Sequence, residues 1–373
     1  MLPFEQGPIR PPSEAESLII RIIRNCPWDK CLFCYIYHDK FSWRTVEEIK
    51  NDILAMKKAK EKILSYALRL GEDNVTGEVV QQVYNHEPEL LQIALWLFRG
   101  GKNVFLQDGD GMVVPPEQLS QILYFIRKQF PSVERITTYG RSKTISGYTA
   151  GQLKMLKDAG LTRIHTGLDT GNDPLLTFLN KGVTAQEQIQ AGLMVKEAGI
   201  SLSEHIHLGL GGKKYWREHA LDTAMALSAI DPPFVRMRTF VPRKGSQLME
   251  YVENGGFQTQ NDDGLALEER LLLQNFDGTG RLISDHILNL LEEVEGNLPD
   301  DMEKAIGVVN SYLNLPPEER VHFSLGRRLG FYRSLKDTAD PILYYQVEEI
   351  KAGLKYRGKD LEEFITECMT NYI

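Results

Sequence analysis

The chain has 373 residues, of which 42% are hydrophobic and 25% charged, and its formal net charge is -8 at pH 7. This composition is typical of a globular protein with a sizeable core, and the length has room for one α/β domain of ~250 residues or more plus an appendage. The acidic balance argues against generic binding to nucleic acid or an anionic membrane surface, and no apolar stretch reaches the ~18–20 residues of a membrane span.

Residues 1–16 are rich in proline and predict an irregular lead-in to the first strand. They lack the charged start and apolar core of a signal peptide, and cysteines are few in the chain, so we expect a cytoplasmic protein. A run of branched apolar residues then predicts a buried strand over 17–25.

Three of the four cysteines follow this strand directly, as Cys26, Cys31 and Cys34. Three thiols in one short loop, with no partner placed for a disulfide framework, predict ligands of a metal or an iron–sulfur cluster. An iron–sulfur cube normally takes four thiolates. Three would leave one iron open to a substrate or a cofactor.

Helices and strands alternate over the next two hundred residues. Apolar residues at helical spacing predict a helix over 42–70, capped by Ser42, and a second over 87–98. Further strands are predicted over 103–107, 135–139, 161–166, 200–208 and 234–241, and further helices over 116–129, 142–159, 171–199 and 215–229. This alternation favours parallel strands.

We therefore predict the α/β fold class, as a partial parallel (β/α)6 barrel of TIM-barrel type over residues 17–250, with a helical insertion at about 54–101. A doubly wound open sheet has the same alternation and remains an alternative. Residues 251–373 are expected to be mainly helical after a loop over 251–264. The helices expected there span 282–294, 299–313, 316–329, 341–354 and 359–371.

Unusual polar residues and glycines fall at the carboxyl ends of the predicted strands, where parallel α/β folds place their sites. Besides the cysteines, these candidates are Gln107, Asp108, Gly109, Asp110, Arg141, Ser142, Asp169, His205, His207, Gly209, Arg236 and Arg238. The two histidines alternate on one strand and share a face, as do Arg236 and Arg238. On the barrel interior they would handle substrate or protons; elsewhere they would be structural. The aspartates also fit ordinary turns and helix caps.

The cysteine spacing, with a barrel behind it, resembles the radical S-adenosylmethionine (radical SAM) superfamily over about 17–248. The resemblance implies a [4Fe–4S] cluster held by Cys26, Cys31 and Cys34, with S-adenosylmethionine on the fourth iron. Phe33 fills the position of the aromatic residue that usually precedes the last cysteine. The spacing here is C-x4-C-x2-C, one residue longer in its first gap than the common C-x3-C-x2-C.

Two further segments correspond to motifs of that family. Residues 107–111 match the glycine-rich segment after the second strand, which implies that Gln107, Asp108, Gly109 and Asp110 receive the amino group of the cofactor. Aspartates stand there in place of the usual glutamate or Thr-Pro. Residues 167–171 resemble a Gly-Leu-Glu-Ser-Gly version of another motif, which implies that Asp169 contacts the ribose or amino-acid end.

By the same analogy, Arg141, followed by Ser142, would take the cofactor carboxylate, and Gly209 would shape the adenine end.

The resemblance implies reductive cleavage of S-adenosylmethionine to a 5′-deoxyadenosyl radical, which abstracts hydrogen from the substrate. An external electron donor such as flavodoxin or ferredoxin is implied as well. Only Cys368 remains for an auxiliary cluster, which argues against methylthiolation and against subfamilies that rely on such clusters. The sequence has no recognisable RNA-binding appendage, so we expect a small-molecule or peptide substrate and no nucleic-acid partner.

Two alternatives stay open: a zinc-stabilised binding or scaffold protein with His38 as fourth ligand, and an iron–sulfur electron-transfer protein.

Overall fold

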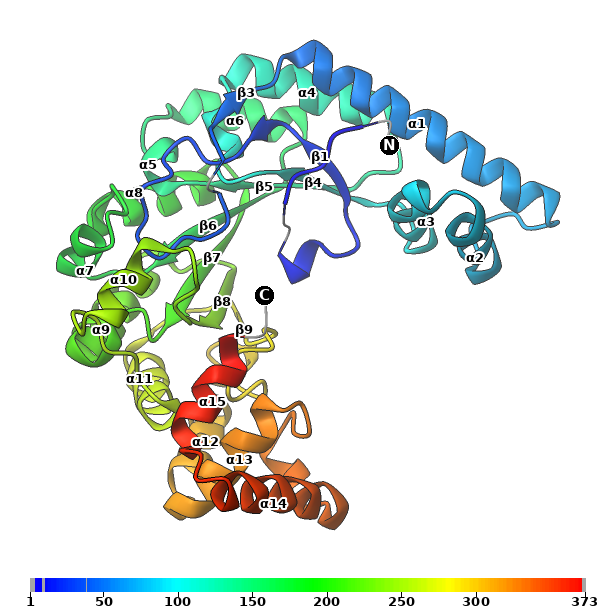
Figure 1. The fold of residues 1–373 in the computed structure, drawn as a ribbon. Coiled ribbons are helices and arrows are strands. Elements are labelled where there is room, and N and C mark those ends of the chain that lie inside the picture. Colours follow the sequence, from blue (N-terminus) through cyan, green and yellow to red (C-terminus); the bar gives the residue numbers. More distant parts are fainter. Residues whose placement is uncertain (1–3, 9–10, 38, 371–373) are drawn as a thin grey trace. The chain divides into compact units, whose positions relative to one another are not determined.

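The computed structural model describes residues 4–8, 11–37 and 39–370 (Figure 1). Its contacts divide the chain into two compact units. The first unit is Met1–Asp29, Ile36–Thr166 and Leu193–Leu202. The second unit is Lys30–Tyr35, Gly167–Gly192 and Ser203–Ile373. Within the described residues, no helix combines the length and the apolar character needed to cross a membrane.

The main sheet has eight strands in the order β1-β4-β5-β6-β7-β8-β9-β10. The six longer strands, in chain order, are β1 Leu18–Arg21, β4 Asn103–Gln107, β5 Arg135–Gly140, β6 Arg163–Asp169, β7 Ser201–Leu208 and β8 Phe234–Thr239. The predicted α/β class with mainly parallel strands is confirmed. A doubly wound sheet reverses its strand order at a switch point, and this sheet keeps sequence order throughout, so that alternative is wrong.

The strand predicted over 17–25 is broken after Arg21. β2 Ile23–Arg24 pairs antiparallel with β3 Ser42–Trp43 in a separate two-stranded sheet. Ser42 is therefore part of a strand, and the prediction that it caps a helix is wrong. α1 Val46–Arg69 begins instead after Thr45, whose hydroxyl accepts a hydrogen bond from the Glu48 N–H while the Glu48 carboxylate accepts from the Thr45 N–H.

The other helices of the first unit largely follow the prediction, with one addition and one break, because the helix predicted over 142–159 is two helices, α5 and α6. α2 Gly77–His86 was not expected, and its buried side is formed by Val79 and Val83. The expected helix over 87–98 is the 3₁₀ helix η2 Pro88–Leu90 followed by α3 Leu91–Phe98. The remaining helices are η1 Pro12–Glu14, η3 Gly111–Val113, α4 Pro116–Gln129, α5 Ser142–Ile145 and α6 Ala150–Ala159.

The second unit contains two short strands that the sequence did not predict. β9 Arg281–Ile283 pairs parallel with β8, and β10 Gly296–Asn297 pairs antiparallel with β9. The helix predicted over 282–294 is therefore wrong. Asn289 holds this segment against β8, because its side chain accepts from the Thr239 N–H at 2.8 Å and donates to the Met237 carbonyl at 2.9 Å. A tertiary contact overrides the local helical pattern here.

The loop predicted over 251–264 is also partly wrong, because two helices enter it. α10 Gln247–Glu253 and α11 Asp262–Asn275 flank a shorter loop, and α11 packs on α9 Gly212–Ile230 and α12 Met302–Leu313. The four later predicted helices are confirmed, with α13, α14 and α15 following α12. The remaining helices of the chain are α7 Asp173–Phe178, α8 Ala185–Glu197, α13 Pro317–Arg328, η4 Leu335–Ala339, α14 Pro341–Tyr356 and α15 Leu361–Thr370.

The second unit fixes the cysteine-loop residues that belong to it. The Leu32 N–H donates to the Leu179 carbonyl at 3.0 Å, and the Leu32 carbonyl accepts from the Leu248 N–H at 2.8 Å. Leu179 and Leu248 belong to a buried apolar cluster against which Leu32 and Phe33 pack. These two backbone hydrogen bonds hold the chain between Cys31 and Cys34 in a set path.

Candidate functional site

The first unit holds a group of candidate residues around Cys26 and the glycine-rich segment after β4. A Cβ atom added to Gly109 would lie 2.9 Å from the Cβ of Cys26 and 3.1 Å from the ring of Tyr37. Burial raises the pKa of the Cys26 thiol, against the lowering effect of the Asp29 and Trp28 N–H groups. Glycine at position 109 therefore lets the segment after β4 pack directly against the first cysteine.

Asp108 lies buried at the end of β4, with a backbone φ of 99°. Its Oδ2 accepts a hydrogen bond from Arg21 Nε at 2.5 Å, and Arg21 Nη1 also donates to Glu5 Oε1 at 2.9 Å. Burial raises the pKa of Asp108, and the Arg21 guanidinium opposes that rise. Residues other than glycine seldom adopt a positive φ, and such positions cluster at functional sites.

The polar neighbours of Asp108 are engaged inside the first unit. The side-chain oxygen of Gln107 accepts from the Gly7 N–H at 2.6 Å. Asp110 is fully buried and accepts from the Arg141 N–H at 3.0 Å and from the Thr144 hydroxyl at 2.5 Å. Burial raises the pKa of Asp110 to about 6. Asp110 therefore anchors the start of α5.

Arg141 and Ser142 lie at that same helix start. The guanidinium of Arg141 lies over the ring of Trp28 in the cysteine loop, 4.7 Å from its centroid. Ser142 is buried as the first residue of α5. Arg141 thus contacts the cysteine loop through Trp28, and the contact of either residue with a cofactor stays a prediction.

The second unit holds a compact set of four side chains, which we call the Asp169 cluster: Asp169, Lys181, His207 and Phe33. The buried Asp169 carboxylate accepts from the Lys181 ammonium and lies 3.0 Å from His207 Nδ1. Lys181 Nζ lies 5.7 Å from the ring centroid of Phe33, and the His207 ring lies 6.1 Å from it. Phe33 thus joins the Asp169 cluster to the loop residue Cys34.

Electrostatics keep Asp169 ionised within this cluster. Burial alone would raise the pKa of this carboxyl, but the nearby Lys181 and His207 hold it well below its usual range. Asp169 also has a positive φ, of 59°, as Asp108 does at the end of its own strand. The cluster therefore presents a fixed negative charge and a fixed positive charge beside the ring of Phe33.

A buried network extends from His207 to α9 and α11. His219 Nε2 lies 3.0 Å from the His207 carbonyl, and His219 Nδ1 lies 2.8 Å from the Thr170 hydroxyl. Burial lowers the pKa of His219 to about 4. Glu268 Oε1 accepts from the Gly209 N–H at 2.7 Å, and burial raises the pKa of Glu268 to about 8. Gly209 is thus held by a carboxyl group of α11.

The histidine and arginine pairs lie side by side on neighbouring strands. In the β7–β8 register His205 pairs with Arg236, and His207 pairs with Arg238. His207 belongs to the Asp169 cluster, and His205, two residues earlier on β7, lies on the same face of the strand. Arg236 is buried and donates to Asp285 Oδ2 at 2.8 Å, which gives it an ion pair within the protein. A role of these residues toward substrate stays a prediction.

Several residues of this region had no signal in the sequence. These are Lys181, His219, Glu268 and Asp285. Lys181 lies in the loop after α7, and the other three lie on helices or in a segment expected to be helical. None belongs to a motif, because their positions depend on how helices pack against the sheet.

The donor set of the cysteine loop suits an iron–sulfur cluster. Cys26, Cys31 and Cys34 are free thiols within nine residues, and thiolates are the usual ligands of such clusters. Across the described residues, no three histidine, cysteine or acidic side chains already surround one metal position. His38, the fourth ligand of the zinc alternative, lies outside those residues. Ligation by the three cysteines stays a prediction.

Comparison with known proteins gives one family match. Residues 80–224 match the model of the Radical SAM superfamily. The matched segment includes Asp108, Asp169 and His207 and begins after the cysteine loop, so it does not test the cysteine spacing. A curated relative, the "Heme chaperone HemW" of Bacillus subtilis (strain 168), is 25% identical over 130 residues, which is 34% of either chain. The aligned part therefore spans about a third of that relative's length.

Solved structures with a similar course of the chain share little sequence with it. Methylornithine synthase (PylB) is 14% identical with a TM-score of 0.44, over 88% of this chain and 85% of its own. The cobalamin-dependent S-adenosylmethionine radical enzyme OxsB is 13% identical with a TM-score of 0.45, over 95% and 53%. The methyltransferase TsrM from Kitasatospora setae is 11% identical with a TM-score of 0.45, over 90% and 61%.

Proposed function

We propose that this chain, an enzyme with a radical SAM domain over residues 80–224, uses the 5′-deoxyadenosyl radical to take a hydrogen atom from a small-molecule or peptide substrate. Its cofactors are a [4Fe–4S] cluster and S-adenosylmethionine, which supply that radical when bound and given one electron. Radical SAM enzymes generally need an external electron donor. The observation that supports the proposal most is the Asp169 cluster, whose member Phe33 comes one residue before Cys34.

The cysteine loop would hold the cluster. Cys31 and Cys34 flank Leu32 and Phe33, and the backbone of Leu32 is hydrogen-bonded through both its N–H and its carbonyl, which fixes the chain between the two thiols. Gly109 has no side chain, which lets the segment after β4 lie against Cys26. A cluster bound here would have protein on the β4 side, and such surroundings exclude water from reactive intermediates.

The Asp169 cluster would receive the polar end of S-adenosylmethionine. Asp169 stays ionised because its pKa is lowered, so it can accept hydrogen bonds from an ammonium or a ribose hydroxyl. Lys181 adds a cation that can pair with the carboxylate of the cofactor. The sequence assigned the binding of that carboxylate to Arg141 alone. Arg141 in the first unit keeps its assignment as a further partner for that carboxylate.

The test is anaerobic reconstitution of the full chain with iron and sulfide, followed by dithionite and S-adenosylmethionine. The proposal expects 5′-deoxyadenosine and methionine in equal amounts, measured by chromatography. Cys26→Ala, Cys31→Ala and Cys34→Ala should each lose the cluster and the products. Cys368→Ala is the matched control, because this cysteine lies buried in α15, and it should keep both.

Two outcomes would contradict the proposal. Stoichiometric zinc without iron would favour the scaffold alternative, and a cluster whose electron paramagnetic resonance signal ignores S-adenosylmethionine would favour electron transfer.

A haem-related role is a second candidate, because 130 residues are 25% identical to a protein named a haem chaperone. Titration of the reconstituted protein with haemin, followed by its absorption spectrum, tests it. A saturable spectral shift would support this candidate, and its absence would leave hydrogen abstraction from another substrate.

A further inference from the structure

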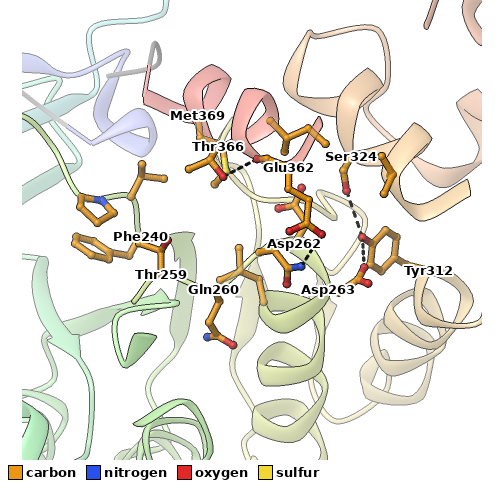
Figure 2. A pocket seen from close by; sticks show the side chains of 16 residues that line it. Phe240, Thr259, Gln260, Asp262, Asp263, Tyr312, Ser324, Glu362, Thr366 and Met369 are labelled. Carbon is orange, nitrogen blue, oxygen red and sulfur yellow. Dashed lines mark hydrogen bonds between the residues drawn. The ribbon is translucent and has the colours of Figure 1, made fainter. Parts of the chain in front are cut away.

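A pocket in the second unit lies beyond the carboxyl end of β8, between residues 240–242 and the helices α11, α12, α13 and α15 (Figure 2). Its empty space is about 620 Å³, including the part open to solvent. The apolar part of its lining includes Phe240, Val241, Pro242, Leu265, Ile365 and Met369. None of these residues belongs to the Asp169 cluster, so the pocket has no role assigned above.

Asp262, the first residue of α11, brings an unsatisfied acceptor into this lining (Figure 2). Its residue is only 7% exposed. Oδ1 accepts a hydrogen bond from the guanidinium of Arg328, whereas the buried Oδ2 has no hydrogen-bond partner among the described residues. A buried acceptor left without a donor costs free energy, so a ligand that donates to Oδ2 would gain the interaction that the protein lacks.

The other charged groups at the pocket are already engaged. Asp263 accepts from the Tyr312 hydroxyl at 2.8 Å and from Arg320 Nε at 2.9 Å. Glu362 is exposed on α15 and accepts from the Asn261 amide at 3.2 Å. The three carboxylates of the lining thus face two guanidiniums, each already paired. This balance favours a cationic ligand over an anionic one.

We propose that this pocket binds an organic amine with an apolar body. The ammonium group donates to Asp262 Oδ2, and the body lies against the apolar side chains that begin at Phe240. A charge-assisted hydrogen bond to a buried carboxylate is stronger than a neutral one, so the amine is preferred over a neutral molecule of the same shape.

Two contacts connect the pocket to the candidate site within the same unit. The ring of Phe240 packs edge-to-face on Phe33 with centroids 6.2 Å apart. Gln260, another lining residue, donates to Glu268, whose second oxygen accepts from the Gly209 N–H. We therefore assign the bound amine as the substrate or the anchoring part of it. Only this last assignment rests on the proposed function; the binding itself does not.

The experiment is isothermal titration calorimetry on the reconstituted full chain under anaerobic conditions. The probes are 2-phenylethylamine and the uncharged 2-phenylethanol, which have the same apolar body. The amine should bind saturably with one site per chain, and the alcohol should bind about tenfold more weakly or worse. Absence of saturable amine binding to the unmodified chain would overturn the proposal.

Three variants locate the binding. Asp262→Asn keeps an oxygen for Arg328 but removes the charge, so the amine should bind about tenfold more weakly and lose its advantage over the alcohol. Thr366→Trp fills the pocket from α15 without touching that ion pair and should abolish binding of both probes. Glu367→Trp is the matched control, because Glu367 is equally exposed on α15 but lies outside the lining.

Amine binding that survives Asp262→Asn and Thr366→Trp unchanged would overturn the proposal. Formation of 5′-deoxyadenosine without amine binding would refute the amine site alone and leave the proposed function standing. Amine binding by a chain that never forms 5′-deoxyadenosine would refute the proposed function and support the pocket.

Discussion

Replacing Glu268 by glutamine should stabilise the protein at neutral and alkaline pH. Glu268 is fully buried on α11, where its carboxyl group meets the Gly209 N–H and the side chain of Gln260. Burial raises its pKa from 4.5 to about 8, and the nearby His219 is neutral because burial lowers its pKa to about 4. The folded protein therefore holds a proton on Glu268 at pH 7 that the unfolded chain has released.

The direction follows from proton linkage. Because the folded pKa of this acid is raised, stability falls as pH rises from about 4.5 to about 8 and is level above that. At pH 7, which is about 2.5 units above the unfolded pKa, the loss of folding free energy is about 3 kcal/mol. Above pH 8 this loss approaches about 5 kcal/mol. Glutamine resembles the protonated acid: its oxygen accepts from the Gly209 N–H, and its NH2 group donates to Gln260 once that amide presents its oxygen, so Glu268→Gln should recover most of that loss. The adjacent Glu269, whose pKa burial also raises to about 8, keeps its own pH dependence.

The assay is the denaturant midpoint of the full chain and of Glu268→Gln at several pH values between 5 and 9. The two proteins should have similar stability near pH 5 and diverge by about 1.4 kcal/mol per pH unit up to about pH 8. Glu303→Gln, which removes an exposed carboxyl on α12, is the control for charge and should follow the unmodified chain. If Glu268→Gln is less stable at pH 8, or if both proteins share one slope, Glu268 is ionised in the folded state and the reasoning fails.

Three further substitutions probe the structure elsewhere. Asp169→Asn should weaken S-adenosylmethionine binding about tenfold or more without changing the iron content. The control Asp158→Asn, on the exposed side of α6, should change neither quantity. If Asp169→Asn binds S-adenosylmethionine as tightly as the unmodified chain, Asp169 is not part of the cofactor site. Gly171→Ala should destabilise by about 3 kcal/mol in thermal unfolding, because the added Cβ would lie 2.2 Å from the Asp222 carbonyl oxygen. Glu14→Gln should cost about 3 kcal/mol at pH 7, since Glu14 is a buried ion-pair partner with a lowered pKa, and the difference should shrink as pH falls below about 4. A constant difference across pH would contradict the last of these.

The sequence predicted the sheet well because strand periodicity and composition are local signals. All six long strands lie where alternating strands and helices placed them, and their sequence order separates a barrel-type winding from a doubly wound sheet. The family match over residues 80–224 agrees with the predicted superfamily, and the predicted class of enzyme and the predicted cofactors rest on that match. The errors fall where a distant residue decides the local fold. Asn289 bonds to β8 and turns an apparent helix into a strand and turns, and pairing with β2 takes Ser42 out of the helix that it was expected to cap.

The candidate site divides in the same way. Asp108, Asp169 and His207 lie at strand ends, and strand ends can be read from a sequence, so these residues were predicted. Lys181, His219 and Glu268 contact Asp169, Thr170 and Gly209 within the second unit from loops and helices, whose approach depends on packing that no spacing encodes.

The residues that approach from loops and helices matter because they set the charge of the residues at the strand ends. Without Lys181 the buried Asp169 would be pushed toward protonation, since burial acts to raise its pKa. The strand ends therefore supply the chemical groups of the site, and the packing of the helices sets their protonation. A sequence motif that names Asp169 cannot by itself say that this carboxyl is charged; the contact with Lys181 supplies that information.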